Sequence, residues 1–140
     1  MARELFVDTS GWYALLDRRD RHHAAARRAL ARSVSRQEVL VTTDYVIDET
    51  ATLTKARGGA QAASRFLDLI EQTRTMRIEW IDPERFDAVR RFFRKHPDHG
   101  YSFTDCASFE VMRKLGIEKV LTTDAHFADA GFATVLDSAT

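Results

Sequence analysis

The 140-residue sequence has little cysteine, proline or glycine: one Cys, two Pro and six Gly. A single cysteine, Cys106, allows no internal disulfide and excludes zinc sites built on paired cysteines. It also suits a reducing compartment. No Pro/Gly-rich linker, internal repeat or low-complexity tract divides the chain. The sequence therefore predicts one domain over residues 1–140.

Long hydrophobic runs are also missing. No segment reaches the roughly 18 apolar residues that a membrane-spanning helix needs. The first residues, Met1-Ala2-Arg3-Glu4, lead directly into a short apolar segment without the features of a signal peptide. We therefore expect a cytoplasmic protein that does not associate with membranes.

The chain has no excess of either charge, because 21 Lys and Arg balance 21 Asp and Glu. This balance gives no direct support for nucleic-acid binding, which usually shows a basic excess. The basic residues are nevertheless concentrated in two stretches, 18–36 and 85–95. Each stretch is either a solvated helix face or a rim that contacts phosphates. With 44% hydrophobic residues, the composition is that of an ordinary globular protein.

Short apolar segments alternate with helical patterns along the chain. The predicted strands are 4–7, 39–42, 77–81, 119–122 and 133–136. The predicted helices are 12–17, 22–32, 44–56, 60–73, 83–94 and 102–116. This alternation predicts an α/β fold, a three-layer α/β/α sandwich around a mostly parallel sheet. In such sheets the ligand site lies beyond the carboxyl ends of the strands.

Two aspartates directly follow predicted strands. Asp8 comes after Glu4-Leu5-Phe6-Val7, and Asp124 comes after Val120-Leu121-Thr122-Thr123. If the strands are parallel, both carboxylates lie at the same edge of the sheet. Each aspartate taken alone is also compatible with a simple turn former.

Two further acids lie within predicted helices. Glu49 falls on the stripe of Tyr45, Leu53 and Ala56 at helical spacing, so we expect it on an inward, otherwise apolar face. A carboxylate in that place is costly unless something pairs with it; the alternative is a partly exposed place at the edge of the stripe. Asp105 begins a similar stripe in the first turn of its helix, where the helix dipole also stabilises a negative charge.

Taken together, the four acids Asp8, Glu49, Asp105 and Asp124 form a stronger signal than any one alone. Carboxylates that converge on one pocket repel each other unless a cation or protons compensate them. Hard oxygen ligands suit Mg²⁺ or Mn²⁺, which also bind phosphate oxygens. The sequence thus predicts a metal site for phosphodiester chemistry built from these four residues.

Four segments that contain these acids are similar to the motifs of a known family, the PIN-domain nucleases. The segments are 6–10 (FVDTS), 44–50 (DYVIDET), 101–106 (YSFTDC) and 121–127 (LTTDAHF). Their order and spacing agree over essentially the whole chain. The sequence most resembles the VapC-type members, which are toxins of bacterial toxin–antitoxin pairs.

The resemblance implies a Mg²⁺- or Mn²⁺-dependent endoribonuclease that cleaves RNA, a cognate antitoxin that blocks the acidic pocket, and a homodimer. Asp8, Glu49 and Asp105 would be the main carboxylates, and Asp124 would complete the site. Ser10 and Thr104 would orient water, metal or phosphate. One position departs from many relatives, because His126 stands where they carry a further acid. The occupancy of a second metal and the role of His126 stay open.

Other functions remain compatible with the sequence. One is a housekeeping RNA-processing nuclease on the same fold without an antitoxin, and another is an inactive RNA-binding scaffold. Retention of all four acids argues against the scaffold. An aspartyl phosphotransferase is disfavoured because Ser10 occupies the position where such enzymes usually carry a second aspartate. Trp12 and Tyr13 belong either to the core or to a partner surface.

Overall fold

The structure, a computed structural model, describes residues 3–136. Five strands form its sheet: β1 (Glu4–Val7), β2 (Val39–Thr43), β3 (Met76–Glu79), β4 (Lys119–Leu121) and β5 (Ala133–Thr134). Seven helices connect them: α1 (Thr9–Leu16), α2 (His23–Ser35), α3 (Asp44–Gly58), α4 (Ala60–Gln72), α5 (Pro83–Lys95), α6 (Phe103–Leu115) and α7 (Ala125–Asp129). Within the described residues, no helix is both long and apolar enough to cross a bilayer.

The sheet has the order β3-β2-β1-β4-β5, and every pair of neighbouring strands is parallel. In the register of the central strands, Phe6 lies opposite Val41 on one side and Val120 on the other. The chain winds outward from β1 in both directions. The strand order therefore reverses between β1 and β4, which is the place where open α/β sheets bind ligands.

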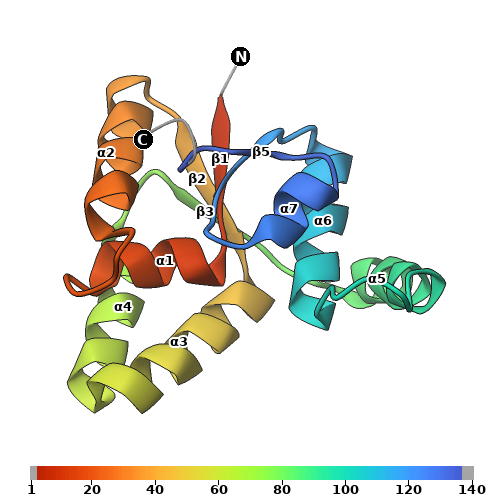
Figure 1. The fold of residues 1–140 in the computed structure, drawn as a ribbon, viewed down its shortest axis with the longest axis horizontal. Coiled ribbons are helices and arrows are strands. Elements are labelled where there is room, and N and C mark those ends of the chain that lie inside the picture. The colour runs from red at the N-terminus through yellow and green to blue at the C-terminus, as the bar shows by residue number, and fades with distance from the viewer. Residues whose placement is uncertain (1–2, 137–140) are drawn as a thin grey trace.

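The helices form two layers, as the connections require. Right-handed crossovers between parallel strands place α1 to α4 on one face of the sheet and α5 to α7 on the other. The contacts agree, since α1 packs on α2 and α3, α3 packs on α4, and α6 packs on α5 and α7. Figure 1 shows these two groups on either side of the sheet. The predicted three-layer sandwich with a parallel sheet is confirmed.

Local signals explain where several helices begin. Asp82 accepts a hydrogen bond from the Arg85 amide ahead of Pro83, which occupies the first helical turn of α5. The Thr43 side chain caps α3 in the same way through the Val46 amide. α6 begins with a reciprocal capping box between Ser102 and Asp105 and ends at Gly116, which has a left-handed backbone.

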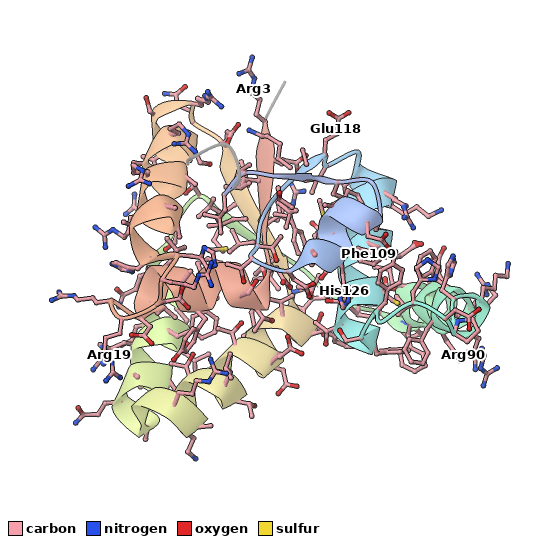
Figure 2. The ribbon with its side chains drawn as sticks, in the orientation of Figure 1. Arg3, Arg19, Arg90, Phe109, Glu118 and His126 are labelled. Carbon is pink, nitrogen blue, oxygen red and sulfur yellow. The ribbon has the colours of Figure 1, made fainter. Side chains whose placement is uncertain are left out.

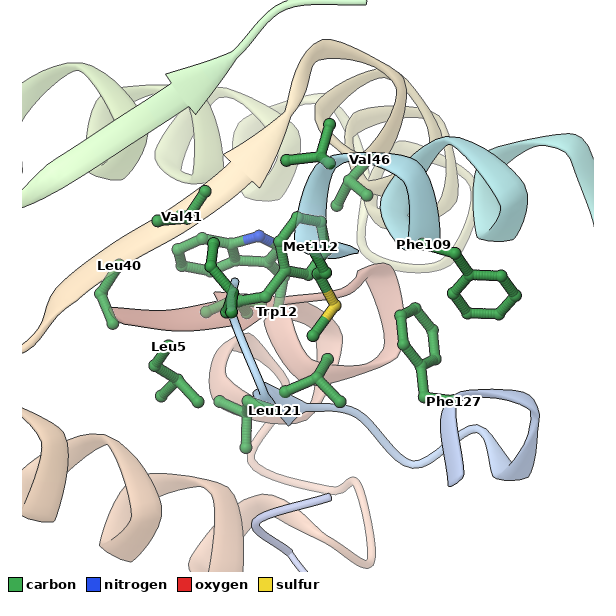
Figure 3. Close-up of a cluster of buried hydrophobic side chains, with 14 of the residues drawn as sticks. Leu5, Trp12, Leu40, Val41, Val46, Phe109, Met112, Leu121 and Phe127 are labelled. Atoms are coloured by element: carbon green, nitrogen blue, oxygen red, sulfur yellow. The ribbon is translucent and has the colours of Figure 1, made fainter. Parts of the chain in front are cut away.

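The core lies between the sheet and both helical layers. Trp12, Phe66 and Phe109 are fully buried with the strand residues Phe6 and Leu121. Figure 3 shows Trp12, Phe109 and Leu121 among the buried side chains around the central strands. Burial of one such side chain contributes about 1.5–3 kcal/mol. Trp12 therefore belongs to the core, which resolves the alternative for this residue.

The helix α1 approaches the sheet closely at Gly11. A Cβ atom added there would lie 2.1 Å from the carbonyl oxygen of Leu121, at the end of β4. Only glycine fits this contact. The Asp8 amide also donates to the Leu121 carbonyl, over 3.1 Å, so β1 and β4 stay paired up to the point where both acidic segments begin.

Several predicted boundaries differ from the structure by a few residues, and one helix was not predicted. α1 begins at Thr9 rather than Trp12, so Ser10 lies in its first turn. The strand predicted at 133–136 is limited to two residues. The five-residue α7 was not predicted, because such a short helix has no hydrophobic periodicity to detect.

Candidate metal centre

A pocket of about 430 Å³ opens at the carboxyl ends of β1 and β4, where the strand order reverses. All four predicted acids line it: Asp8, Glu49, Asp105 and Asp124. They come from four segments far apart in the sequence. Topology brings them together, because Asp8 and Asp124 follow adjacent parallel strands and α3 and α6 pack against each other.

Asp8 is the most deeply buried of these acids, with 4% of its surface exposed. Its Oδ2 atom accepts a hydrogen bond from the Thr122 hydroxyl over 3.0 Å and a longer one from Ser10 over 3.4 Å. The pKa of Asp8 is raised from 3.8 to about 7, mainly by burial and to a smaller extent by the nearby carboxylates of Asp105 and Asp124. The Thr9 amide and the Thr122 hydroxyl act against this rise, since both bond to the charged form.

Asp105 is buried in the first turn of α6. Its Oδ2 atom accepts the Ser102 amide proton over 3.0 Å, while the Ser102 hydroxyl accepts the Asp105 amide proton over 2.9 Å. These two hydrogen bonds orient the Asp105 side chain, which lines the pocket. The predicted inward position of Asp105 in the first turn of its helix is confirmed.

Asp124 and His126 form a compact group with Asp105. Asp124 caps α7 by accepting the His126 amide proton over 2.9 Å. The His126 Nδ1 atom lies 3.1 Å from Asp105 Oδ2 and 3.2 Å from Asp124 Oδ1. One potential ligand atom from each of these three side chains lies within 4.8 Å of the others. Figure 2 shows His126 beside α6 and α7, whereas Arg19 and Arg90 extend away on opposite sides of the molecule.

The predicted inward face of α3 is wrong by part of a turn. Its buried stripe is Val46, Thr50 and Thr54, and Glu49 is exposed. Two of the three buried residues are threonines, which are polar. The hydrophobic pattern therefore predicted that the neighbouring stripe of Tyr45, Glu49 and Leu53 faces inward. Glu49 nevertheless lines the acidic pocket from its open side, next to Leu53.

Ser10 takes part in the hydrogen-bond network beneath the acids. Its hydroxyl lies 2.9 Å from the Thr122 hydroxyl and accepts the Thr123 amide proton over 2.9 Å. Thr104 lies in the first turn of α6. From this turn and its cap, Asp105 and Ser102 line the pocket, whereas Thr104 is not among the lining residues. The predicted roles of Ser10 and Thr104 toward water, metal or phosphate stay predictions.

Sequence reasoning missed Thr122 as a member of the site. Its buried hydroxyl donates to Asp8 and accepts the Asp124 amide proton over 3.0 Å, so it joins the two strand-end acids. Its place at the end of the β4 segment, two residues before the acid, is the signal that could have identified it. Asp20, in a turn after α1, also lines the pocket.

Sequence reasoning also missed Arg57, the basic residue that lines the acidic pocket. Its guanidinium carbon lies 5.0 Å from the centre of the Tyr13 ring. Arg57 and Tyr13 also line a second groove, together with Arg19 and Arg65. Arg57 stands eight residues after Glu49, two turns along the same side of α3. This spacing on the predicted helix could have placed Arg57 near Glu49 from the sequence alone.

The two basic stretches have different surroundings. From the first, Arg19 lines the second groove, but Arg32 and Arg36 line another cavity together with Glu38 and Lys119. In the second, Arg90 and Arg91 pair with Asp87. Arg85 pairs with Glu79.

Cys106 follows Asp105 but is buried in the core. Burial raises the pKa of its thiol to about 11, so the nucleophilic thiolate is scarce at neutral pH.

The donor set fits a hard divalent cation. A carboxyl group that is 4% exposed and faces two other carboxyl groups must either hold a proton or share a cation. The available ligands are carboxylate oxygens and one imidazole nitrogen, which suit Mg²⁺ and Mn²⁺ and exclude a thiolate site.

The PIN domain family matches residues 5–133, which include all four acidic segments. The chain belongs to the PIN domain family. The predicted membership is thereby confirmed. The chain has 36% identity over 131 residues to the 23S rRNA-specific endonuclease VapC20 of Mycobacterium tuberculosis, a match that covers 94% of this chain and 97% of that protein. This match confirms the predicted likeness to VapC-type members.

Three solved structures extend the comparison. The crystal structure of Mycobacterium tuberculosis VapC20, described as a sarcin-ricin loop cleaving toxin, superposes with a TM-score of 0.84 at 35% identity, over 92% of this chain and 96% of that one. VapBC2 from Rickettsia felis, bound to a promoter DNA fragment, gives a TM-score of 0.68 at 8% identity, over 94% and 96%. FitAcB from Neisseria gonorrhoeae gives a TM-score of 0.65 at 14% identity, over 93% of this chain and 95% of that one. The last two show a shared fold.

Proposed function

We propose that this chain is a Mg²⁺- or Mn²⁺-dependent endoribonuclease and the toxin of a toxin–antitoxin pair, acting in the cytoplasm. The observation that carries the proposal is the convergence of Asp8, Asp105 and Asp124 on one pocket at the reversal of strand order. The likeness to VapC20 extends over 94% of the chain, and the family match over residues 5–133 includes every residue that lines the pocket.

Asp8, Glu49, Asp105 and Asp124 would hold the cation. When bound, such an ion polarises a phosphodiester and activates water for attack on phosphorus. The protein contributes the side chains that orient the carboxylates around the ion. Thr122 and Ser10 orient the Asp8 carboxylate by hydrogen bonding, and the capping box orients Asp105. The open side of the pocket, beside Glu49 and Arg57, admits the phosphodiester.

Ribosomal RNA is the substrate class that we propose. VapC20 carries the names of a 23S rRNA-specific endonuclease and a sarcin-ricin loop cleaving toxin. The groove that continues from the pocket is lined by Arg19, Arg57 and Arg65, whose guanidinium groups suit phosphates of an RNA strand. This local basic surface answers the objection raised by the net charge of zero.

A cognate antitoxin and a second copy of the chain are the proposed protein partners. Exposed aromatic residues support an association surface: Phe86 and Phe93 are 43% and 42% exposed, and their rings lie 5.7 and 5.5 Å from that of Phe103. Trp80 is 62% exposed. We propose that this aromatic surface of α5 and α6 forms the homodimer. Light scattering should give a dimer for the wild type and a monomer for Phe93→Ser; an unchanged dimer refutes this surface.

Mapping of RNA ends after induction tests the function. The wild-type chain should arrest growth and create new ends within ribosomal RNA, and Asp105→Asn should relieve the arrest and remove those ends. Asp98→Asn, at an exposed position, is the charge-matched control and should stay toxic. In vitro, cleavage should need added Mg²⁺ or Mn²⁺ and stop with chelator. Toxic Asp105→Asn, or equal cleavage in chelator, would refute the proposal.

A toxin and a housekeeping RNA-processing nuclease differ in their dependence on a partner. The toxin should be neutralised by the product of a short adjacent reading frame that encodes a DNA-binding protein. Growth arrest that this partner does not relieve would favour the housekeeping nuclease.

A further inference from the structure

His126 lies where a third metal ligand is expected, between two acids. Its Nδ1 atom lies 3.1 Å from an oxygen of Asp105 on α6 and 3.2 Å from an oxygen of Asp124 before α7. An octahedral ion with ligand distances of about 2.1 Å sets neighbouring ligand atoms about 3 Å apart. The two distances from His126 therefore match the spacing of neighbouring ligands in such a coordination sphere, and the ligand atoms of all three side chains lie within 4.8 Å of one another.

The surroundings of His126 fix the direction in which its ring points. Its backbone amide donates to Asp124, which holds the first turn of α7. The far side of the ring lies against Gly100, where an added Cβ would be 3.1 Å from Nε2. The ring also meets the Tyr101 ring edge to face, with centroids 5.6 Å apart. Nδ1 is thus left facing the acids, while 38% of the side chain is exposed, and His126 lines the pocket.

A purely structural ion pair explains this arrangement less well. The oxygen of Asp105 that His126 contacts already accepts the Ser102 amide proton, and the oxygen of Asp124 already accepts the His126 amide proton. Both acids are therefore oriented without the imidazole ring. The ring instead places one nitrogen lone pair or proton at the point where the two carboxylates converge.

We propose that His126 coordinates the divalent ion through Nδ1, together with Asp105 and Asp124, and that this nitrogen shifts the preference of the site from Mg²⁺ toward Mn²⁺. This inference rests on the proposed function, since it concerns the same ion. Mg²⁺ favours oxygen ligands, whereas Mn²⁺ binds imidazole more readily. A histidine in place of an acid also leaves one negative charge fewer in a pocket that is already lined by five carboxylates.

Pulsed electron paramagnetic resonance of the Mn²⁺-loaded protein tests the proposal without any activity measurement. The wild type should show coupling of the Mn²⁺ electron spin to a directly bound nitrogen. His126→Ala and His126→Asp should lose that coupling. His99→Ala removes another imidazole near Tyr101 and should leave the signal unchanged.

Calorimetric titrations with Mn²⁺ and Mg²⁺ supply the second measurement. His126→Ala should weaken Mn²⁺ binding by at least the roughly tenfold that loss of even an outer-shell partner costs. His126→Asp should recover divalent-ion binding and favour Mg²⁺ relative to the wild type, because it returns an oxygen ligand.

The outcomes separate this proposal from the one on which it depends. Bound Mn²⁺ with no nitrogen coupling in the wild type, or with coupling that survives His126→Ala, overturns the role of His126 alone. A wild-type protein that binds neither ion overturns the metal-dependent function as well.

Discussion

The Thr122 hydroxyl donates a hydrogen bond to Asp8 over 3.0 Å and accepts the Asp124 amide proton over the same distance. One buried side chain directly after β4 therefore connects the two acids that follow the central strands. Its bond favours the ionised form of Asp8 and lowers the pKa of that carboxyl, against the larger effect of burial.

Thr122→Val should shift the pH dependence of metal binding. Without the hydroxyl, the pKa of Asp8 rises further above about 7, so the carboxylate that binds the ion forms only at higher pH. The pH at which Mn²⁺ binding is half-maximal should therefore increase. Calorimetric titrations across a pH series measure this shift.

Thr54→Val is the matched control for Thr122→Val. Thr54 is also buried, but its hydroxyl has no hydrogen-bond partner within the described residues. The same isosteric change there should leave the pH profile of Mn²⁺ binding in place. Identical profiles for Thr122→Val and the wild type would show that Thr122 does not govern the ionisation of Asp8.

Asp8→Asn should stabilise the metal-free protein, and increasingly so between pH 4 and 7. In this window the folded protein keeps the Asp8 proton while the unfolded chain loses it, because the folded pKa is about 7 and the ordinary value is 3.8. Stability of the wild type therefore falls as the pH rises, and the asparagine variant lacks this loss. At about 1.36 kcal/mol per pKa unit, the difference is on the order of a few kcal/mol at pH 8.

Denaturant unfolding in chelator at pH 5 and pH 8 measures this effect. Asp68→Asn, at an exposed position on α4, should show no comparable gain. Added Mn²⁺ should restore the wild-type stability at pH 8 and leave Asp8→Asn nearly unchanged. A stability gain for Asp8→Asn that is equal at both pH values would contradict the raised pKa.

Gly11→Ala should destabilise the fold and misplace Asp8. The new methyl group would lie 2.1 Å from the Leu121 carbonyl oxygen, so α1 must move away from β4. Overpacking of this kind costs about 1–3 kcal/mol or more. Thermal unfolding measures the loss. Gly58→Ala is the control, because the added methyl group meets only the Ala62 methyl at 3.0 Å, so the loss of thermal stability should be smaller. Equal losses of stability in the two variants would refute the close contact with Leu121 as the cause.

Arg57→Gln should weaken the binding of RNA more than its turnover. Arg57 lines both the acidic pocket and the adjoining groove, so it is placed to contact a phosphate beside the cleaved bond. Steady-state cleavage should show a higher KM with kcat little changed. The slope of log affinity against log salt should decrease by about 0.7, the value for one single-strand phosphate contact. Arg27→Gln, exposed on α2, controls for lost charge and should change neither.

Much of the fold could be predicted from the sequence because the strands are short, apolar and separated by capped helices. The acids at the strand ends, Asp8 and Asp124, followed from that pattern and from the rule for parallel sheets. Asp105 followed as well, because it begins a stripe at helical spacing in the first turn of a predicted helix.

Other features depend on tertiary packing that periodicity does not encode. The face of α3 was misjudged because Thr50 and Thr54, although polar, are buried. Thr122 and Arg57 join the site only through the pairing of β1 with β4 and through the direction of α3. The contact of His126 with both acids depends on α7, a helix too short to be predicted.

The central claim is that acids from distant segments share one divalent ion. A crystal of the wild-type protein soaked in Mn²⁺, measured at a wavelength where manganese scatters anomalously, tests it most directly. The account predicts an anomalous peak bonded to carboxylate oxygens of Asp8, Asp105 and Asp124. A fully soaked crystal with no peak in this pocket, or with manganese bound only elsewhere, would contradict it.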